Sequence, residues 1–163
     1  MVIDPQLYRR VLGQYPTGIA AITAQEGIEH PVAQIVGTFT SVSMEPPLVA
    51  FLPAKTSRSW ASIKKSGKFC VNVLAENHQA LCQTIFQGEP DVLNSLEYSL
   101  TSSGNPRFDG CLAWIDCSVW AVHDAGDHEI VIGLIENLEA GDAKKPLVFF
   151  QGQYGTFQEF TNK

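Results

Sequence analysis

A short run of basic and hydroxyl side chains, Lys55-Thr56-Ser57-Arg58-Ser59, has the composition of a binding site for a small anion. Lys55 and Arg58 are expected just before a predicted helix, where backbone N–H groups without an acceptor in the helix converge with positive charge. No acidic residue occurs between Glu45 and Glu76, although the whole chain has a net charge of −6. A concentrated positive segment in an acidic chain suits one phosphate group better than a polyanion, because the surrounding field repels a long phosphate backbone.

A second group of polar side chains, Thr38, Thr40, Ser41 and Ser43, follows Gly37 in a predicted strand. One interpretation is an ordinary polar strand face with Gly37 as a bulge. The other is a wall along which a ligand approaches the backbone closely, because glycine has no side chain there. From these residues alone both interpretations stay open.

His128 follows Asp127 in a predicted turn and lies near His123 and Asp124. Imidazole and carboxylate groups are metal ligands, and histidine also contacts polar cofactors. The same residues are equally typical of a solvated hairpin turn. The pattern therefore leaves a cofactor contact, a turn and a metal site as alternatives.

Many strands and a few short helices are expected to position these residues. Gly67 is expected to end the helix that follows the anion run, while Pro46-Pro47 should break a strand ladder. A surface excursion is expected over 87–109, and the aromatic residues are expected mostly in the core. The predicted helices cover 5–12, a stretch from a cap at Ser57 or Ser59 through Ile63 to the stop at Gly67, and 76–86. The predicted strands cover 18–24, 31–36, 38–43, 48–52, 69–74, 98–100, 112–122, 129–138 and 147–150, with turns at 25–29 and 124–127.

Length and composition favour one globular domain over 1–163. Hydrophobic residues make up 45% of the 163 residues, and no apolar run approaches the roughly 20 residues that cross a bilayer. The net negative charge disfavours nucleic acid and anionic membranes as partners. Four cysteines without a C-x-x-C pair are expected to be reduced thiols in a cytoplasmic protein. Mostly hairpin-type connections predict a mainly β fold, a closed or nearly closed antiparallel barrel with peripheral helices.

Several ordered blocks, spanning about Leu12 to Phe157, resemble the short-chain flavin reductase family. They are Tyr15-Pro16-Thr17-Gly18, the run from Gly37-Thr38-Phe39-Thr40 to Pro46-Pro47-Leu48-Val49, Lys55-Thr56-Ser57-Arg58-Ser59, Gly67-Lys68-Phe69-Cys70-Val71-Asn72-Val73-Leu74, and Gly126-Asp127-His128 with Gly133 downstream.

The resemblance implies an FMN-binding split barrel, usually a homodimer, that uses NADH or NADPH to reduce a flavin for a partner such as a monooxygenase. It implies that His128 approaches the nicotinamide. The implied flavin-binding residues are Ile35, Val36, Gly37 and Thr38 beside the ring and ribityl chain, Ser41 and Ser43 in the same strand, and Lys55, Thr56, Ser57, Arg58 and Ser59 at the phosphate. No metal is implied.

Some positions depart from the pattern of the family. Gly37-Thr38 replaces the Asn-Ser pair of many members, and Gln151 and Gln153 stand where relatives often carry basic residues. The excursion after Phe86 lacks a basic-aromatic pair. Gly37-Thr38 removes a side-chain amide from the flavin edge, whereas the glutamines and the missing pair weaken pyrophosphate contact and so favour FMN over FAD and NADH over NADPH.

Two other functions are compatible with the same residues. One is a non-catalytic flavin carrier or redox sensor that has lost efficient nicotinamide binding. The other is a related split-barrel oxidase acting on a pyridoxal-type phosphate, because one phosphate pocket suits either ligand.

Overall fold

The structure is a computed structural model that describes residues 3–25, 30–88, 92–143 and 145–160. Within these ranges no helix is long and apolar enough to span a bilayer. In chain order the elements are α1 (Pro5–Leu12), β1 (Thr17–Gly18), β2 (Ala20–Gln25), β3 (Pro31–Val36), β4 (Thr40–Met44), β5 (Pro47–Phe51), α2 (Arg58–Ser66), β6 (Lys68–Val73), η1 (Glu76–His78), α3 (Gln79–Gln87), η2 (Val92–Ser95), β7 (Ser99–Leu100), β8 (Pro106–Arg107), β9 (Ala113–Ala125), β10 (His128–Ala140), β11 (Val148–Phe150) and β12 (Gln153–Gly155).

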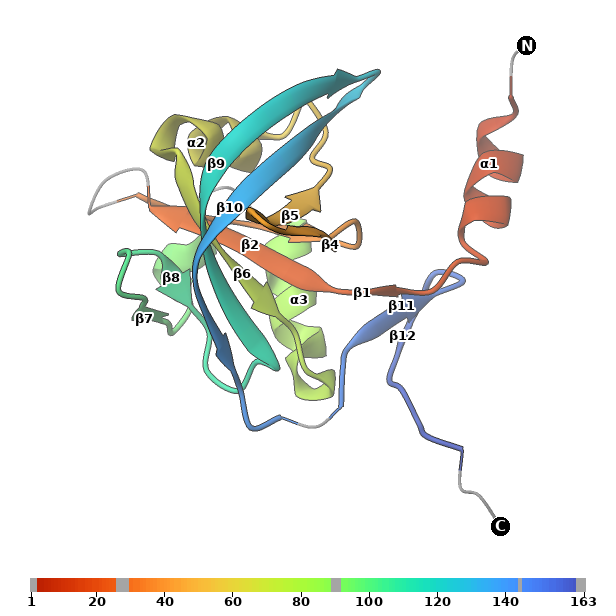
Figure 1. Ribbon diagram of the computed structural model, residues 1–163. Coiled ribbons are helices and arrows are strands. Elements are labelled where there is room, and N and C mark those ends of the chain that lie inside the picture. The colour runs from red at the N-terminus through yellow and green to blue at the C-terminus, as the bar shows by residue number, and fades with distance from the viewer. Residues whose placement is uncertain (1–2, 26–29, 89–91, 144, 161–163) are drawn as a thin grey trace.

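A seven-stranded antiparallel sheet with the order β3-β2-β6-β9-β10-β5-β4 forms the body (Figure 1). Its edge strands β3 and β4 are separated by only residues 37–39 in the chain, so the two edges must come close together at that corner. No ladder joins them among the described residues. The sheet is thus curled without being closed, which confirms the expected mainly β class and shows that, of the two expected forms, the barrel is not the closed one.

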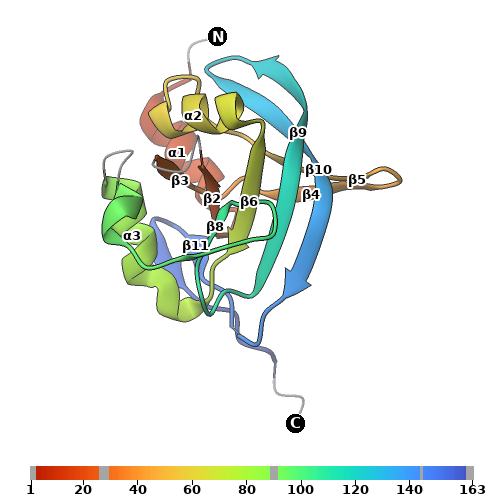
Figure 2. The ribbon, with the colours of Figure 1, turned by 90° about the vertical axis from the view of Figure 1, so that its left-hand side faces the viewer.

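Two apolar clusters pack on opposite faces of the sheet. The inner cluster contains Phe51, Phe69 and Trp60, and α2 covers it (Figure 2). The ring of Phe51 meets the rings of Phe69 and Trp60 edge to face, with centroids 5.2 and 5.7 Å away, respectively. The outer cluster includes Leu74 and Trp114 and lies under α3 and the segment around η2 and β8. The alternation of side chains along each strand directs successive residues into these two layers.

Helix α2 has Ser57, one of its two expected caps, at its start and ends at Gly67 as predicted. The Ser57 hydroxyl caps it by accepting the N–H of Trp60 at 3.1 Å, and Gly67 ends it with φ of 70°, a conformation that favours glycine. Arg58 and Ser59 are therefore the first two helical residues, within the first turn. The expectation that Arg58 precedes the helix was wrong by one residue.

The excursion after α3 is less superficial than expected. Its described part buries Leu93, Pro106 and Phe108 against the sheet. In the side-chain amide of Asn72, the oxygen accepts the backbone N–H of Phe108 at 2.9 Å and the nitrogen donates to the carbonyl of Pro106. A polar side chain buried on the sheet needs such partners, so this segment folds onto it.

Other expectations were confirmed or corrected in detail. The strands on either side of the first turn form the β2–β3 hairpin, whereas residues 26–29 of that turn lie outside the described residues. Pro46-Pro47 does not end the ladder, because Pro47 pairs with Met44 in a β4–β5 hairpin. All four cysteines are free and buried. Trp120 and five of the nine phenylalanines are exposed rather than in the core: Phe86, Phe149, Phe150, Phe157 and Phe160.

Candidate functional site

Two adjoining pockets, each of about 280 Å³, form one groove along the outer side of β3. They share Ile35 of β3 and Phe86 of α3. The polar pocket is lined by Ala33, Gln34, Ile35, Ser57, Arg58, Ser59, Ile85, Phe86 and Gly88. The apolar pocket is lined by Thr17, Ile19, Ile35, Gly37, Cys82, Phe86, Phe149 and Tyr154.

The polar pocket is built around the N-terminus of α2. The Ser57 hydroxyl, which caps the helix, also donates to the Gln34 side-chain oxygen at 3.0 Å and so ties the helix to β3. Arg58 and Ser59 line the pocket beside it. The first helical turn has N–H groups without an acceptor inside the helix, and the helix dipole places partial positive charge there. This end of the groove is suited to an anion such as a phosphate.

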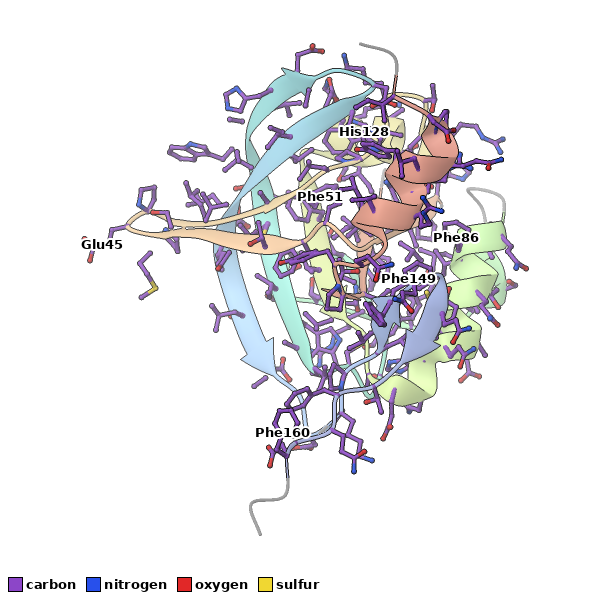
Figure 3. All side chains as sticks on the ribbon, turned by 90° about the vertical axis from the view of Figure 1, so that its right-hand side faces the viewer. Glu45, Phe51, Phe86, His128, Phe149 and Phe160 are labelled. Carbon is purple, nitrogen blue, oxygen red and sulfur yellow. The ribbon has the colours of Figure 1, made fainter. Side chains whose placement is uncertain are left out.

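The apolar pocket is walled by rings from three elements. Figure 3 shows Phe86 of α3 and Phe149 of β11 on the same side of the molecule. The ring of Phe149 meets that of Tyr154 edge to face with centroids 5.4 Å apart. A flat aromatic ligand with apolar faces fits such walls.

Cys82 and Tyr154 are the titratable side chains that line this end of the groove. Their Sγ and Oη atoms lie 3.5 Å apart, and this hydrogen bond together with burial raises the pKa of Tyr154 to about 12. Burial raises the pKa of the Cys82 thiol. Both side chains are therefore neutral near pH 7, so the pocket offers walls and neither a nucleophile nor a base.

Gly37 lies where β3 meets the apolar pocket. A Cβ atom added to it would stand 2.8 Å from the Thr17 hydroxyl, which also lines this pocket. The absence of a side chain permits this end of β3 to pack closely against β1. The close approach of a ligand to the backbone of Gly37 stays a prediction.

The side chains of Val36 and Thr38, on either side of Gly37 in the expected ring-binding segment, do not line the two pockets. Val36 is buried in the inner cluster, so only its main chain faces outward. The Thr38 hydroxyl accepts the N–H of Leu52 at 3.0 Å and thereby joins the β3–β4 link to the end of β5. Ser41 and Ser43 lie on the edge strand β4, and neither lines the two pockets.

Lys55 and Thr56 also lie outside the two pockets. The Lys55 ammonium pairs with Asp124 near the tip of the β9–β10 hairpin. The backbone N–H of Lys55 donates to the carbonyl of Asp127 at 3.0 Å. Of the expected phosphate run, the structure thus brings Ser57, Arg58 and Ser59 together at the pocket and directs Lys55 toward the hairpin.

His128 is the first residue of β10, because the turn is shorter than predicted and consists of Gly126 and Asp127 alone. A β-bridge to Ala54 places it beside the segment that leads into α2. Its Nδ1 lies 2.7 Å from the Asp127 carboxylate, and this bond lowers the pKa of Asp127. The half-exposed side chain lines neither pocket (Figure 3). The part of the chain that the structure describes holds no cluster of three metal-ligating residues.

Sequence reasoning missed most of the apolar pocket. Ile19 and Cys82 look like ordinary core residues in the sequence, and Phe149 looks like a residue of a last strand. The strands that carry this wall, β1 and β12, are only 2 and 3 residues long and were not predicted. The one available signal was a pair of aromatic residues on either side of Gln151-Gly152. Both Gln151 and Gly152 have positive φ and form the turn between them.

Comparison with known proteins identifies the family of the chain. Residues 12–158 match the family model described as flavin reductase like domain. The chain is 46% identical over 155 residues to a flavin reductase of Pseudomonas putida, covering 95% of this chain and 91% of the relative. It is 45% identical over 153 residues, 93% of this chain and 77% of the relative, to the reductase subunit HsaB of a flavin-dependent monooxygenase from Rhodococcus jostii.

A solved structure is similar over nearly the whole chain. The crystal structure of nitrilotriacetate monooxygenase component B from Mycobacterium thermoresistibile aligns with a TM-score of 0.90 and 40% identity, over 98% of this chain and 91% of that one. The chain therefore belongs to the flavin reductase-like family. This confirms the resemblance and, with it, the expected class of enzyme, an oxidoreductase that reduces flavin.

Proposed function

We propose that the chain, as one domain over 1–163, transfers a hydride from NADH to FMN that lies along the groove. The observation that carries this proposal is the continuity of an anion-suited helix N-terminus with an apolar, aromatic-walled pocket through the shared residues Ile35 and Phe86. A phosphate at one end and a flat ring at the other match the two ends of FMN.

The phosphate is assigned to the polar pocket. Ser57, Arg58 and Ser59 contact it directly, whereas Lys55 and Thr56 contribute from the preceding loop, Lys55 through the field of its charge. An FMN phosphate carries about −1.5 to −2 charges at pH 7, which favours the charge-assisted bonds that arginine forms. The glutamines at Gln151 and Gln153 do not provide the charge that a second phosphate would need, which supports FMN over FAD and NADH over NADPH.

The ring is assigned to the apolar pocket and the end of β3. Ile35, Val36, Gly37 and Thr38 offer main-chain groups along its edge, and Ser41 and Ser43 follow on β4. When bound, the flavin supplies the hydride acceptor, so the protein needs no acid or nucleophile between donor and acceptor. The work of these residues is to hold the two rings about 3 to 3.5 Å apart and to exclude water.

His128 is proposed to orient the nicotinamide. Its β-bridge to Ala54 puts it one segment from α2, and its exposed ring can contact a second cofactor that arrives from solvent. We further propose a cytoplasmic homodimer that delivers reduced flavin to a partner monooxygenase. Support for that partner comes from relatives that are reductase subunits of monooxygenase systems.

Rapid mixing with NADH under argon, followed by flavin absorbance, tests the assignment of His128. His128→Ala should slow the reduction about tenfold while FMN affinity stays nearly unchanged, because the residue positions the donor and carries no hydride. His123→Ala, an exposed histidine on the same hairpin, is the matched control and should reduce normally. An unchanged rate in His128→Ala would assign the residue to the turn alone.

Dithionite separates the reductase from the flavin carrier or sensor. It should reduce the wild type and both variants equally, because it does not need the nicotinamide site. A wild type that binds FMN and accepts electrons from dithionite, but from neither NADH nor NADPH, would overturn the reductase and favour the carrier.

A further inference from the structure

A third pocket, of about 180 Å³, lies away from the groove. Strands β9 and β10 and the turn between β7 and β8 line it, and it shares no lining residue with the two pockets of the groove. Figure 1 shows β7 and β8 on the opposite side of the body from β11 and β12, which wall the apolar pocket. The third pocket is therefore separate from the proposed flavin site.

A buried carboxylate, that of Asp116 in β9, lines this pocket and is only 3% exposed. Its Oδ1 atom accepts the Thr101 hydroxyl at 3.0 Å and the side-chain amide of Asn105 at 3.1 Å. No described residue donates to its Oδ2 atom. Every fully buried polar side-chain atom of the described residues has a partner, so Oδ2 must be the atom that reaches the pocket. This oxygen needs a donor that comes from the pocket itself.

The charge of Asp116 is not matched by a cation of the described chain, because no Lys, Arg or His there pairs with it. Arg107 lines the pocket, but its guanidinium forms bonds of 2.8 and 3.2 Å with the Glu139 carboxylate and lies over the Trp114 ring, 3.8 Å from its centroid. Two carboxylates and one guanidinium thus line the pocket, which leaves one negative charge in excess. A buried charge without a counter-ion is costly, so the pocket favours a cation.

Hydrogen bonds fix the shape of the pocket before a ligand arrives. The Thr101 hydroxyl, which donates to Asp116, also accepts the backbone N–H of Asn105 at 3.2 Å, and the N–H of Thr101 donates to the carbonyl of Asn105 at 2.9 Å. The carbonyl of the next residue, Pro106, accepts from the side-chain amide of Asn72 in β6. The turn between β7 and β8 is therefore held over the carboxylate, and a ligand pays little to order it.

We propose that the third pocket binds a small primary amine in its alkylammonium form. An ammonium has one positive charge and N–H donors, so it can bond to Oδ2 of Asp116 and cancel the excess charge. Ser102 and Asn137 line the pocket as further acceptors, and Leu100 offers an apolar contact to the carbon chain. A divalent metal suits the pocket less, because the described residues contain no cluster of three metal-ligating side chains and Arg107 repels a second positive charge.

Isothermal titration calorimetry with butylammonium chloride at pH 7 tests the site without reference to flavin or NADH. The wild type should bind about one butylammonium per chain, with a dissociation constant of about 1 mM or lower. Tetramethylammonium keeps the charge without N–H donors, and 1-butanol keeps the carbon chain without the charge. Both should bind at least about tenfold more weakly, because neither donates a charge-assisted hydrogen bond.

Two variants test the residues. Asp116→Asn removes the charge with little change of shape and should weaken butylammonium binding at least about tenfold. Asp124→Asn, the same substitution on the same strand but outside the pocket, is the matched control and should bind like the wild type. Because Asp116 is buried, Ser102→Phe is made as well: it adds a ring at an exposed position of the pocket, where it should block the amine and leave the fold intact.

Three results would overturn the proposal. The first is a wild type that binds no butylammonium, whose pocket then holds water only. The second is equal binding of tetramethylammonium and butylammonium, which would reduce the effect to the attraction of any cation to an acidic chain. The third is wild-type affinity in both Asp116→Asn and Ser102→Phe. Melting temperatures of the same samples show that the variants are folded, and FMN titration reports on the groove separately.

Discussion

The two ends of the groove have the same volume but are built in different ways. The polar pocket depends on three consecutive residues, Ser57, Arg58 and Ser59, whose positions follow from one helix cap. The apolar pocket collects side chains from five elements that lie up to 137 residues apart in the chain, from Thr17 in β1 to Tyr154 in β12. The helix N-terminus of the polar pocket is a local structure, although β3 and α3 complete its walls, whereas the apolar pocket exists only after distant segments have folded together.

This difference teaches where specificity and affinity arise. A local anion site distinguishes a phosphorylated ligand from one without phosphate, since charge-assisted bonds act on that group alone. An apolar pocket treats both ligands alike, because its contribution depends on the area of ring that it buries. Substitutions at the two ends should therefore change FMN and riboflavin binding in different proportions.

The largest expected effect is at the polar end. Arg58→Ala should weaken FMN binding by roughly tenfold or more, since a charge-assisted contact contributes about 1.5 to 3 kcal/mol, and should leave riboflavin nearly unaffected. Fluorescence titration with each flavin measures both constants. Lys55→Ala is the comparison variant: Lys55 does not line the polar pocket, whereas Arg58 does, so Lys55→Ala should weaken FMN binding less than Arg58→Ala does. Equal losses for both flavins would show that this helix N-terminus is not the phosphate site.

At the apolar end, Gly37→Val should weaken FMN and riboflavin by the same factor, about fivefold. The new side chain would meet the Thr17 hydroxyl, already 2.8 Å from an ideal Cβ, and fill the end of the pocket. Overpacking of this kind costs about 1 kcal/mol or more. Gly155→Val is the control, because a Cβ there has nothing within 4 Å. A variant that lost FMN affinity but kept riboflavin affinity would contradict the division between the two ends.

Both pockets share α3, and His78 holds its start. The Nδ1 atom accepts the N–H of Ala75 at 3.2 Å and Nε2–H donates to the carbonyl of Asp109 at 3.0 Å, so the ring is neutral and burial lowers its pKa. A depressed histidine pKa means that the unfolded chain binds more protons, so stability should fall as pH decreases below about 6.5. Protonation of Nδ1 removes the hydrogen bond from the Ala75 N–H, which contributes about 1 kcal/mol to stability.

Chemical denaturation between pH 7.5 and 5.5 measures this effect. In His78→Gln the free energy of unfolding should depend less on pH than in the wild type. An identical pH dependence in both proteins would exclude His78 as its source.

The smallest expected effect is that of Tyr154→Phe. It removes the hydroxyl that bonds the Cys82 sulfur at 3.5 Å but keeps the ring against Phe149. Because sulfur forms weak hydrogen bonds, both flavins should bind within about twofold of wild type. Tyr154→Ala, which removes the ring as well, should weaken both flavins more. If Tyr154→Phe weakened binding as much as Tyr154→Ala, the hydroxyl and not the ring would be the important group.

The elements with strong local signals were predicted from the sequence nearly to the residue. Helix α1 ends at Leu12 before Gly13, and α2 lies between the Ser57 cap and Gly67, because caps and glycines act within one turn. The β2–β3 and β9–β10 hairpins were recognised from apolar runs around turn residues. The short strands β1 and β12 were missed, since they form only because β11 pairs with both.

Local order in the chain thus determined the capped N-terminus of α2, the mainly β class and the family blocks, because these depend on neighbouring residues and their spacing. Tertiary structure alone decided which residues share the groove. It placed Thr17, Cys82 and Phe149 in one pocket and paired Lys55 with Asp124. It also buried the Val36 side chain in the inner cluster, on the other face of the sheet. The physical reason is that either face of a strand can be buried and that a loop can adopt many conformations. Only packing against the rest of the chain selects the buried face and the loop conformation.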